Sequence, residues 1–382
     1  MGPLAGVKVI EISGIGPGPF CGMLLADLGA TVIAVEPPER LAAPERPHAI
    51  TSRGKQSVVL NLKHPVAVEA VLRLCEGADL LIEGMRPGVM ERLGLGPEVC
   101  LQRRPALVYG RMTGWGQDGP WAPRAGHDSN YTALSGALWF ASPPDQPPMA
   151  PSTVLGDVAG GALYLAVGLL AALQHARSTG QGQVVDAAIV DGAAHMLNLM
   201  LGAIQRRGGS FARGTQAFDA SHWAAQSFRC KDGGWINLAP LEPRFYAELL
   251  ARLGLSGDAR FVRGQNDPDL WPALRQAMAA RISSRTRAEW EACLEGSDAC
   301  WAPVLAPDEA ARHPHLASRQ SYVEHGGVLQ ASPAPRFSAT PAALRDIAPA
   351  GTHTREILGA LDFTPDNLEE LLSSNTPEFA RT

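Results

Sequence analysis

The first third of the chain alternates short apolar runs with helical segments, and no other feature constrains the fold as strongly. The helical segment 19–29 places Phe20, Met23 and Leu24 on one face and stops at Gly29. The runs between such segments are rich in β-branched residues, as are strands buried on both faces of a parallel sheet. The sequence therefore predicts an α/β fold with helices on both faces of the sheet, and strands in "VKVIEI" (7–12), "TVIAVEPP" (31–38), "SVVLNL" (57–62), "DLLIEGM" (79–85) and "ALVYGRMTG" (106–114).

The second half of the chain changes character. We predict long apolar helices at 157–176 and 184–205, then a linker without periodicity at 206–222. A hairpin around Asp232-Gly233-Gly234 and amphipathic helices near 243–254, 268–282 and 286–295 indicate a smaller α+β domain. The predicted organisation is a large CoA-binding domain at 1–190, a linker helix and loop at 191–223, a small domain at 224–305, and a return to the large domain at 306–382.

Composition excludes some functions. The net charge is −5 and the isoelectric point is near 6.1, which argues against partners such as nucleic acid or an anionic membrane. The six cysteines form no CxxC pair and no metal-binding spacing, so we expect reduced thiols and no metal. The longest apolar stretch, 158–173, spans about 24 Å as a helix, short of a bilayer core of about 30 Å. With no targeting signal in view, we expect a cytoplasmic location.

The glycine-rich stretch "SGIGPGPFCG" (13–22) follows the first predicted strand, where many α/β proteins bind a dinucleotide. Glu36, 20 residues after Gly16, occupies the position of the acidic residue that binds an NAD ribose. The glycine spacing does not fit the GxGxxG motif, however. Gly14, Gly16 and Gly18 alternate, and Gly22 follows Gly18 by four residues instead of three. Two prolines also remove N–H groups that would cradle a pyrophosphate. The stretch therefore disfavours a dinucleotide-dependent oxidoreductase.

Several long blocks resemble the class III (CaiB/BaiF-type) CoA-transferase family, and within it the α-methylacyl-CoA racemases. They are "GIGPGPFCGMLLADLGATVIAVEPP" (14–38), "EGMRPGVMERLGLGP" (83–97), "YGRMTGWGQDGPWAPRAGHDSNY" (109–131), "GDVAGG" (156–161), "GQVVDAAIVDG" (182–192), "LEPRFY" (241–246) and "SDACWAPVL" (297–305). The resemblance implies a Rossmann-like large domain, a small domain and an interlocked homodimer. Each active site would lie between the large domain of one subunit and the small domain of the other.

Two residues suit the chemistry that the resemblance implies. Epimerising the α-carbon of a thioester needs two acid/base groups on opposite faces and a means of stabilising the enolate oxygen. His127 lies near a predicted helix start, and a histidine side chain in general can both take and give a proton near neutral pH. Asp157 precedes an apolar helix, so from the residues alone it is also an N-cap whose neighbouring N–H groups face a developing enolate. The resemblance implies that His127 and Asp157 are the two bases and that Glu242, reached across the dimer, supports the histidine.

The resemblance also implies the residues that bind coenzyme A, which is part of the substrate and not a separate cofactor. Arg53 and Lys55 are weaker candidates for charge near a phosphate. Three departures affect the pocket: Pro37 stands where similar racemases have Arg, Thr153 where they have Asn, and 215–223 keeps only Asp219 of the usual segment. The implied CoA-binding residues are Ile15, Gly16, Leu60, Asn61, Leu62, Lys63, Gly84, Met85, Arg86, Arg92, Gly126, Asp128, Ser129, Asn130 and Tyr131.

The resulting prediction is a racemase of 2-methylacyl-CoA thioesters that acts by proton transfer through an enolate. The alternative is a CoA transferase of the same fold, in which Asp157 is the nucleophile and carries CoA or an acyl group as a mixed anhydride. A non-catalytic CoA-binding protein is disfavoured by the presence of both bases. The acyl group is left open, with branched fatty acyl, bile-acid-like and arylpropionyl thioesters all compatible with the pattern.

Overall fold

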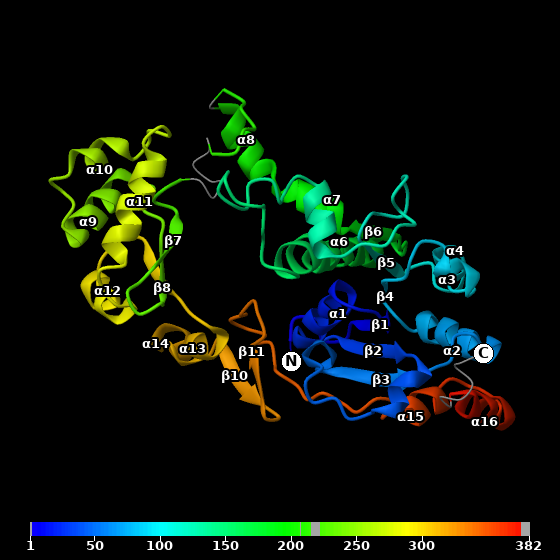
Figure 1. Ribbon diagram of the computed structural model, residues 1–382. Helices are drawn as coiled ribbons and strands as arrows, with labels where there is room; N and C mark the ends of the chain where they lie inside the picture. Colours follow the sequence, from blue (N-terminus) through cyan, green and yellow to red (C-terminus); the bar gives the residue numbers. More distant parts are fainter. Residues whose placement is uncertain (1, 207, 215–221, 376–382) are drawn as a thin grey trace. The chain divides into compact units, whose positions relative to one another are not determined.

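A computed structural model describes residues 2–206, 208–214 and 222–375, which form two compact units (Figure 1). Unit 1 contains the chain up to Ser135, Pro151–Met196 and the chain from Gln320 onward. Unit 2 contains Gly136–Ala150 and Leu197–Arg319. Most of the divergent stretch 215–223, with Asp219, lies outside the described residues.

Unit 1 is built around the predicted parallel sheet, which confirms the α/β fold. Among the described residues the sheet has six strands in the order β3-β2-β1-β4-β5-β6, and every neighbouring pair is parallel. This order reverses direction between β1 and β4, as in doubly wound nucleotide-binding folds. The strands are β1 (Lys8–Ile12), β2 (Thr31–Glu36), β3 (Lys55–Val59), β4 (Leu80–Glu83), β5 (Val108–Thr113) and β6 (Val184–Ala188).

Helices cover both faces of this sheet and bury a separate core on each. On β1, Val9 packs into one core and Ile10 into the other, as the two-residue period of a strand requires. The first core includes side chains of α1 (Pro17–Asp27) and α6 (Leu163–Thr179). The second includes side chains of α2 (Pro65–Glu76), α4 (Pro97–Arg103), α15 (Thr354–Gly359) and α16 (Pro365–Ser374). The other elements of unit 1 are η1 (Pro38–Ala42), η2 (Ile50–Ser52), α3 (Val89–Arg92), α5 (Asp128–Leu134), the π-helical turns η3 (Val154–Ala162), α7 (Ile189–Met196), and the hairpin of β10 (Tyr322–His325) and β11 (Val328–Ala331).

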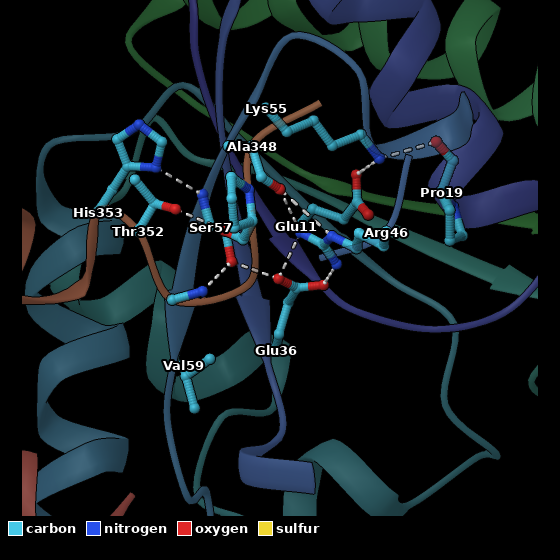
Figure 2. Close-up of polar contacts among 12 residues, drawn as sticks. Glu11, Pro19, Glu36, Arg46, Lys55, Ser57, Val59, Ala348, Thr352 and His353 are labelled. Carbon is cyan, nitrogen blue, oxygen red and sulfur yellow. Dashed lines mark hydrogen bonds and ion pairs between the residues drawn. The ribbon is translucent and has the colours of Figure 1, made fainter. Parts of the chain in front are cut away.

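The C-terminal segment covers the exposed edge of the sheet along β3. The Ser57 carbonyl accepts the N–H of His353 at 3.0 Å, and the Ser57 N–H donates to Nδ1 of His353 at 3.1 Å (Figure 2). Further along, the Val59 N–H donates to Oγ1 of Thr354 at 3.0 Å, and the Asn375 amide donates to the Val59 carbonyl at 2.8 Å. These bonds satisfy backbone groups that an edge strand would otherwise present to other chains.

The predicted helix at 184–205 is wrong over its first residues, because Val184–Ala188 form β6 and pair with β5. Helix α7 follows at once, and α8 (Asn198–Arg206) begins two residues after α7 ends. A short apolar run fits a buried helix and a strand equally well by periodicity. Here the partner strand decides, since Tyr109 and Val184 are in register.

Unit 2 has the predicted α+β composition. The hairpin turns at Asp232, whose carboxylate accepts the N–H of Gly234 at 3.2 Å, and Gly233 takes a positive φ of 88°. The helices and strands pack around a core that includes Trp223 and Trp290. The antiparallel sheet contains β7 (Gln226–Arg229), β8 (Trp235–Leu238) and β9 (Trp301–Val304), with α9 (Pro243–Leu253), α10 (Ala259–Gly264), α11 (Trp271–Ile282), α12 (Arg287–Leu294), α13 (Pro307–Arg312) and α14 (Pro314–Ser318). The short helices α10, α13 and α14 were not predicted.

The helical stretch Val154–Thr179 is long and apolar enough to cross a membrane, by length and composition only. Core helices of soluble proteins meet the same criterion. One side of α6, including Leu165 and Leu169, packs in the first core of unit 1, whereas Leu163 and Val167 on the other side are exposed. The helix therefore carries an apolar surface that unit 1 does not cover.

Candidate active site

A cavity of about 580 Å³ opens at the carboxyl edge of the sheet in unit 1. Its walls come from the segments that follow β1, β4 and β5, together with the loop before α5, α5 itself, η3 and the start of α7. In open α/β sheets, ligands bind outside the carboxyl ends of the strands where the strand order reverses. The cavity lies at that point, so the sheet topology and the hollow indicate the same site.

The opening glycine-proline turn forms one wall. Residues Gly14 to Pro19 line the cavity, and Ile15 is 92% exposed. Gly16 precedes α1 with a positive φ of 72°, and a Cβ placed there would lie 3.3 Å from Oδ2 of Asp157. A glycine is required here on both counts, since it accepts the backbone angle and lets the turn approach the carboxylate. Ile15 and Gly16 therefore lie in the cavity wall, and their contact with coenzyme A stays a prediction.

His127 lies where α5 begins, as predicted. It is the N-cap residue, with an extended backbone, and its N–H donates to Oδ1 of Asn130 at 3.0 Å. The exposed side chain lines the cavity together with Asn130. The bond to Asn130 fixes the backbone from which the imidazole projects.

Asp157 is not the N-cap that the sequence predicts. It lies inside the π-helical turns η3, and the residue before η3 is Thr153, with an uncommon positive φ of 65°. The N–H of Val158 donates to the carbonyl of Thr153 at 3.0 Å, the wide i to i+5 spacing of a π-helix. Single π-helical turns are rare and occur often at functional sites. The Asp157 side chain lines the cavity.

Asp128 supports the segment that carries Asp157. Its carboxylate is buried and does not line the cavity, and its two oxygens accept the N–H of Gly156 at 3.0 and 3.1 Å. The expectation that N–H groups beside Asp157 face an enolate is therefore wrong for Gly156 and Val158, whose N–H groups are already bonded. The Asp128 carboxylate therefore has a structural role, and the implied contact of this residue with coenzyme A stays a prediction.

The electrostatic surroundings raise the pKa of Asp157. Burial is the main cause, the nearby charge of Asp128 acts in the same direction, and His127 opposes both. Burial also raises the pKa of Tyr131, with Asp157 adding to the shift and Arg86 opposing it. A carboxylate with a raised pKa is a stronger base, which suits a residue that must remove a weakly acidic proton.

Aromatic side chains form part of the cavity wall. The ring of Tyr131 packs edge-on against Trp115, with centroids 4.6 Å apart, and Trp115 packs edge-on against Trp121 at 4.9 Å. The guanidinium carbon of Arg124 lies 4.6 Å from the centroid of Trp121. Sequence reasoning missed Trp115 and Arg124, both of which line the cavity. The signal that could have found them is their place in the same block as His127.

The rest of the implied CoA-binding set is divided. Gly84, Met85, Arg86, Gly126, Asn130 and Tyr131 line the cavity, whereas Leu60, Asn61, Leu62, Lys63, Arg92 and Ser129 do not. The residues 60–63 follow β3, two strands away along the same edge of the sheet, and Leu60 is buried in the second core. Nη1 of Arg92 approaches Gly88, two residues from Arg86. Contacts of these residues with coenzyme A stay predictions.

Glu242 belongs to unit 2, at the start of α9 and directly before Pro243, as predicted. Its side chain makes no capping bond to the helix, whereas its carbonyl accepts the N–H of Tyr246 at 3.0 Å. The supporting role beside the histidine stays a prediction. In the part of the chain that the structure describes, no group of three or more His, Cys, Asp or Glu residues could hold a metal ion.

Two basic residues that the sequence offers for a phosphate are used inside the fold. Arg53 binds the Asp27 carboxylate at 2.6 and 3.0 Å, and both side chains are buried. Nζ of Lys55 lies 2.6 Å from Oε2 of Glu11 and donates to the carbonyl of Pro19 at 2.8 Å (Figure 2). The proposed contacts of Arg53 and Lys55 with a phosphate are therefore wrong.

Glu36, the residue in the NAD ribose position, is also occupied. It forms an ion pair with Arg46 through both oxygens and accepts a hydrogen bond from the Ser57 hydroxyl (Figure 2). The carboxylate is buried, at 3% exposed. It cannot receive ribose hydroxyls without losing these bonds, which adds to the glycine spacing as evidence against a dinucleotide site.

Comparisons with known proteins show the family to which the chain belongs. The model of the CoA-transferase family III matches residues 4–354. The chain is 37% identical over 378 residues to the alpha-methylacyl-CoA racemase of Homo sapiens, covering 98% of this chain and 97% of that protein. It is 31% identical to the succinyl-CoA–D-citramalate CoA-transferase of Chloroflexus aurantiacus, covering 97% and 96%. The crystal structure of a CAIB/BAIF family protein from Brucella suis superposes with a TM-score of 0.81 at 28% identity, covering 94% of this chain and 100% of that one. The chain belongs to the CoA-transferase family III.

Proposed function

We propose that the protein epimerises 2-methylacyl-CoA thioesters by moving a proton between the two faces of the α-carbon. The observation that carries the proposal is that His127 and Asp157 project from different elements into one cavity. The similarity to a racemase over nearly the whole chain supports the same reaction. Two acid/base groups around one carbon are what a racemase needs and what a simple binding protein does not.

In the proposed reaction, the Asp157 carboxylate removes the α-proton of one epimer. The electron pair of the broken C–H bond moves onto the thioester oxygen as an enolate, and the protonated His127 imidazole gives a proton to the opposite face. This leaves Asp157 protonated and His127 neutral, so the other epimer reacts by the same steps in reverse. The raised pKa of Asp157 reduces the difference between the pKa of this base and the pKa of the weakly acidic α-carbon.

The substrate supplies coenzyme A, so the proposal includes no separate cofactor. The Gly14–Pro19 turn would pack beside the pantetheine arm, and Arg86 would meet a phosphate. Arg86 lines the cavity and forms no ion pair with the residues that the structure describes. A guanidinium left without a carboxylate partner in a cavity is suited to an anionic ligand.

We further propose that the active unit is a homodimer in which Glu242 of the partner subunit approaches His127. The exposed apolar side of α6, with Leu163 and Val167, supports association because such surfaces mark interfaces. Sedimentation of the intact protein at several concentrations tests this part. A monomer with full activity would refute it.

The test of the reaction is isotope uptake. One epimer of a 2-methylacyl-CoA is incubated with the protein in D₂O, and deuterium at the α-carbon is followed together with the epimer ratio. We expect both to change in the wild type and to slow by about 10²–10⁴-fold in His127→Ala and Asp157→Asn. His175→Gln, at an exposed histidine outside the cavity, is the matched control. Epimerisation at the wild-type rate in His127→Ala would refute the assignment.

A CoA transferase is the second candidate, supported by the similarity to the succinyl-CoA–D-citramalate CoA-transferase. There Asp157 would attack the thioester as a nucleophile and His127 would be dispensable. The two functions separate in one experiment, with a free carboxylic acid added to the incubation. Transfer of CoA to the added acid without deuterium uptake, retained in His127→Ala, would establish the transferase.

A further inference from the structure

Arg124 is an anchored cation in the wall of the cavity. It lies three residues before His127, and both side chains line the hollow. Its guanidinium is stacked on Trp121, which packs edge-on against Trp115. Stacking on an aromatic face holds a guanidinium in place while its N–H edge stays free to donate. The arginine is therefore positioned before any ligand arrives.

Nothing in the described residues neutralises this charge. Other arginines of unit 1 have carboxylate partners, such as Arg53 with Asp27 and Arg111 with Glu83. Arg124 forms no ion pair within the part of the chain that the structure describes, and it shares the cavity wall with Arg86, which forms none either. The cavity thus offers two separate guanidinium groups to a ligand.

The position of Arg124 decides which anion it meets. Three residues span at most about 11 Å even when extended, so the backbone of Arg124 lies within that distance of the backbone of His127, and both side chains line the same cavity. In coenzyme A, the pantetheine arm holds the diphosphate roughly 15 Å from the sulfur when extended, by the rise of a peptide-like chain. The phosphates are then remote from the loop that carries His127, and Arg86 remains to bind them. A carboxylate on the acyl group, close to the α-carbon, is then the substrate anion nearest to the loop that carries Arg124.

We propose that Arg124 binds a carboxylate on the acyl chain, so that the substrate class is CoA thioesters of 2-methyl-branched dicarboxylic acids. The inference rests on the proposed function, because it takes the α-carbon to lie between His127 and Asp157. A guanidinium and a carboxylate form paired N–H to oxygen bonds in a fixed geometry. Such a contact would orient the thioester as well as select it.

The test compares two thioesters that differ in one group. These are 2-methylbutanoyl-CoA and the 1-CoA thioester of 2-methylsuccinic acid, in which a carboxylate replaces the terminal methyl group. The measured quantity is the ratio of kcat/KM for deuterium uptake, carboxylated over uncharged. We expect Arg124→Gln to lower this ratio by about 10- to 100-fold, since hydrogen bonds to charged groups have that strength. Arg124→Lys should keep part of the preference for the carboxylated thioester. Arg104→Gln, at an exposed arginine outside the cavity, should leave the kcat/KM ratio unchanged.

Two outcomes overturn the inference. One is a ratio that Arg124→Gln leaves unchanged. The other is an equal loss on both thioesters with weaker inhibition by free CoA, which would assign Arg124 to the phosphates. If the wild type takes up no deuterium from either thioester, the proposed function fails. The dissociation constants of the two thioesters then test the role of Arg124 separately. A carboxylate preference in binding that Arg124→Gln removes supports the inference, and its absence overturns it.

Discussion

Replacing Lys55 with methionine should expose how much the buried pair beneath the opening turn contributes to the fold. The Lys55 and Glu11 side chains are each 3% exposed, and Nζ lies 2.6 Å from the carboxylate. Methionine keeps an unbranched apolar stem but removes the charge and the donor to the Pro19 carbonyl. Breaking one side of a buried ion pair costs about 3–5 kcal/mol, because the remaining charge is left without a partner.

The size of the loss should depend on pH. Burial raises the pKa of Glu11, and Lys55 is the main group that lowers it again. Without Lys55 the pKa of Glu11 in the folded protein rises further above the pKa of Glu11 in the unfolded chain. The folded state then holds a proton that the unfolded state has released, so stability is highest at low pH and falls as pH rises through the folded pKa. Lys55→Met should therefore be closer to the wild type at pH 5 than at pH 8.

The free energy of unfolding is measured in urea, and hydrogen exchange at the β1 and β3 amides reports that quantity for unit 1 alone. The double variant Glu11→Gln/Lys55→Met is the matched control, since replacing both partners removes the unpaired charge. It should recover at least half of the loss seen at pH 8. A single variant within about 1 kcal/mol of the wild type at pH 8, or a double variant no more stable than the single one, would refute the reasoning.

Other substitutions test the site and its support. Asp128→Asn should lower the pKa of Asp157 by removing a nearby negative charge, so the acid limb of the pH profile for deuterium uptake should move to lower pH, and a shift to higher pH would contradict this. Gly16→Ala should cost about 1–2 kcal/mol through its positive φ and reduce kcat by crowding the carboxylate, while circular dichroism stays native. Gly192→Ala places a Cβ 1.9 Å from a backbone oxygen of η3 and should destabilise unit 1 by about 1–3 kcal/mol or more in urea, whereas Gly202→Ala, with only a flexible side-chain tip nearby, should not.

The sheet could be predicted because its information is local. The strands of the first third are short apolar runs, most of them with β-branched residues, and α2 keeps its apolar residues on one face. The position of His127 before α5 follows from the same kind of local pattern. A site at the carboxyl ends of parallel strands then follows from topology, once the strands are known.

The buried ion pairs and hydrogen bonds could not be predicted, because the residues that form them are far apart in the chain. Arg53 looks like a surface cation until the fold brings Gln330 within 3.0 Å of it, 277 residues later. A charge at the end of a strand has the same local pattern whether it meets a ligand or a buried carboxylate. The local sequence therefore predicted a phosphate as the partner of Arg53 and Lys55, whereas the fold pairs them with buried carboxylates.

The π-helical turns of η3 were missed for a related reason. The stretch around Asp157 is apolar and glycine-rich, which predicts an ordinary helix with an aspartate cap. What sets it apart is contact, since Gly160 lies directly against α7 and Asp128 binds the Gly156 N–H. Arg124 was passed over because one charged residue in a loop carries no periodicity.

The contact between β3 and the C-terminal segment has a consequence during synthesis. Ser57 leaves the ribosome 296 residues before His353, and unit 2 is translated between them. At 5–20 residues per second, this amounts to roughly 15–60 s in which the nascent sheet has an open edge. The edge of the sheet along β3 is therefore covered only after the segment from His353 to Asn375 has been translated. During that interval the edge strand presents unpaired N–H and carbonyl groups with which another chain can pair.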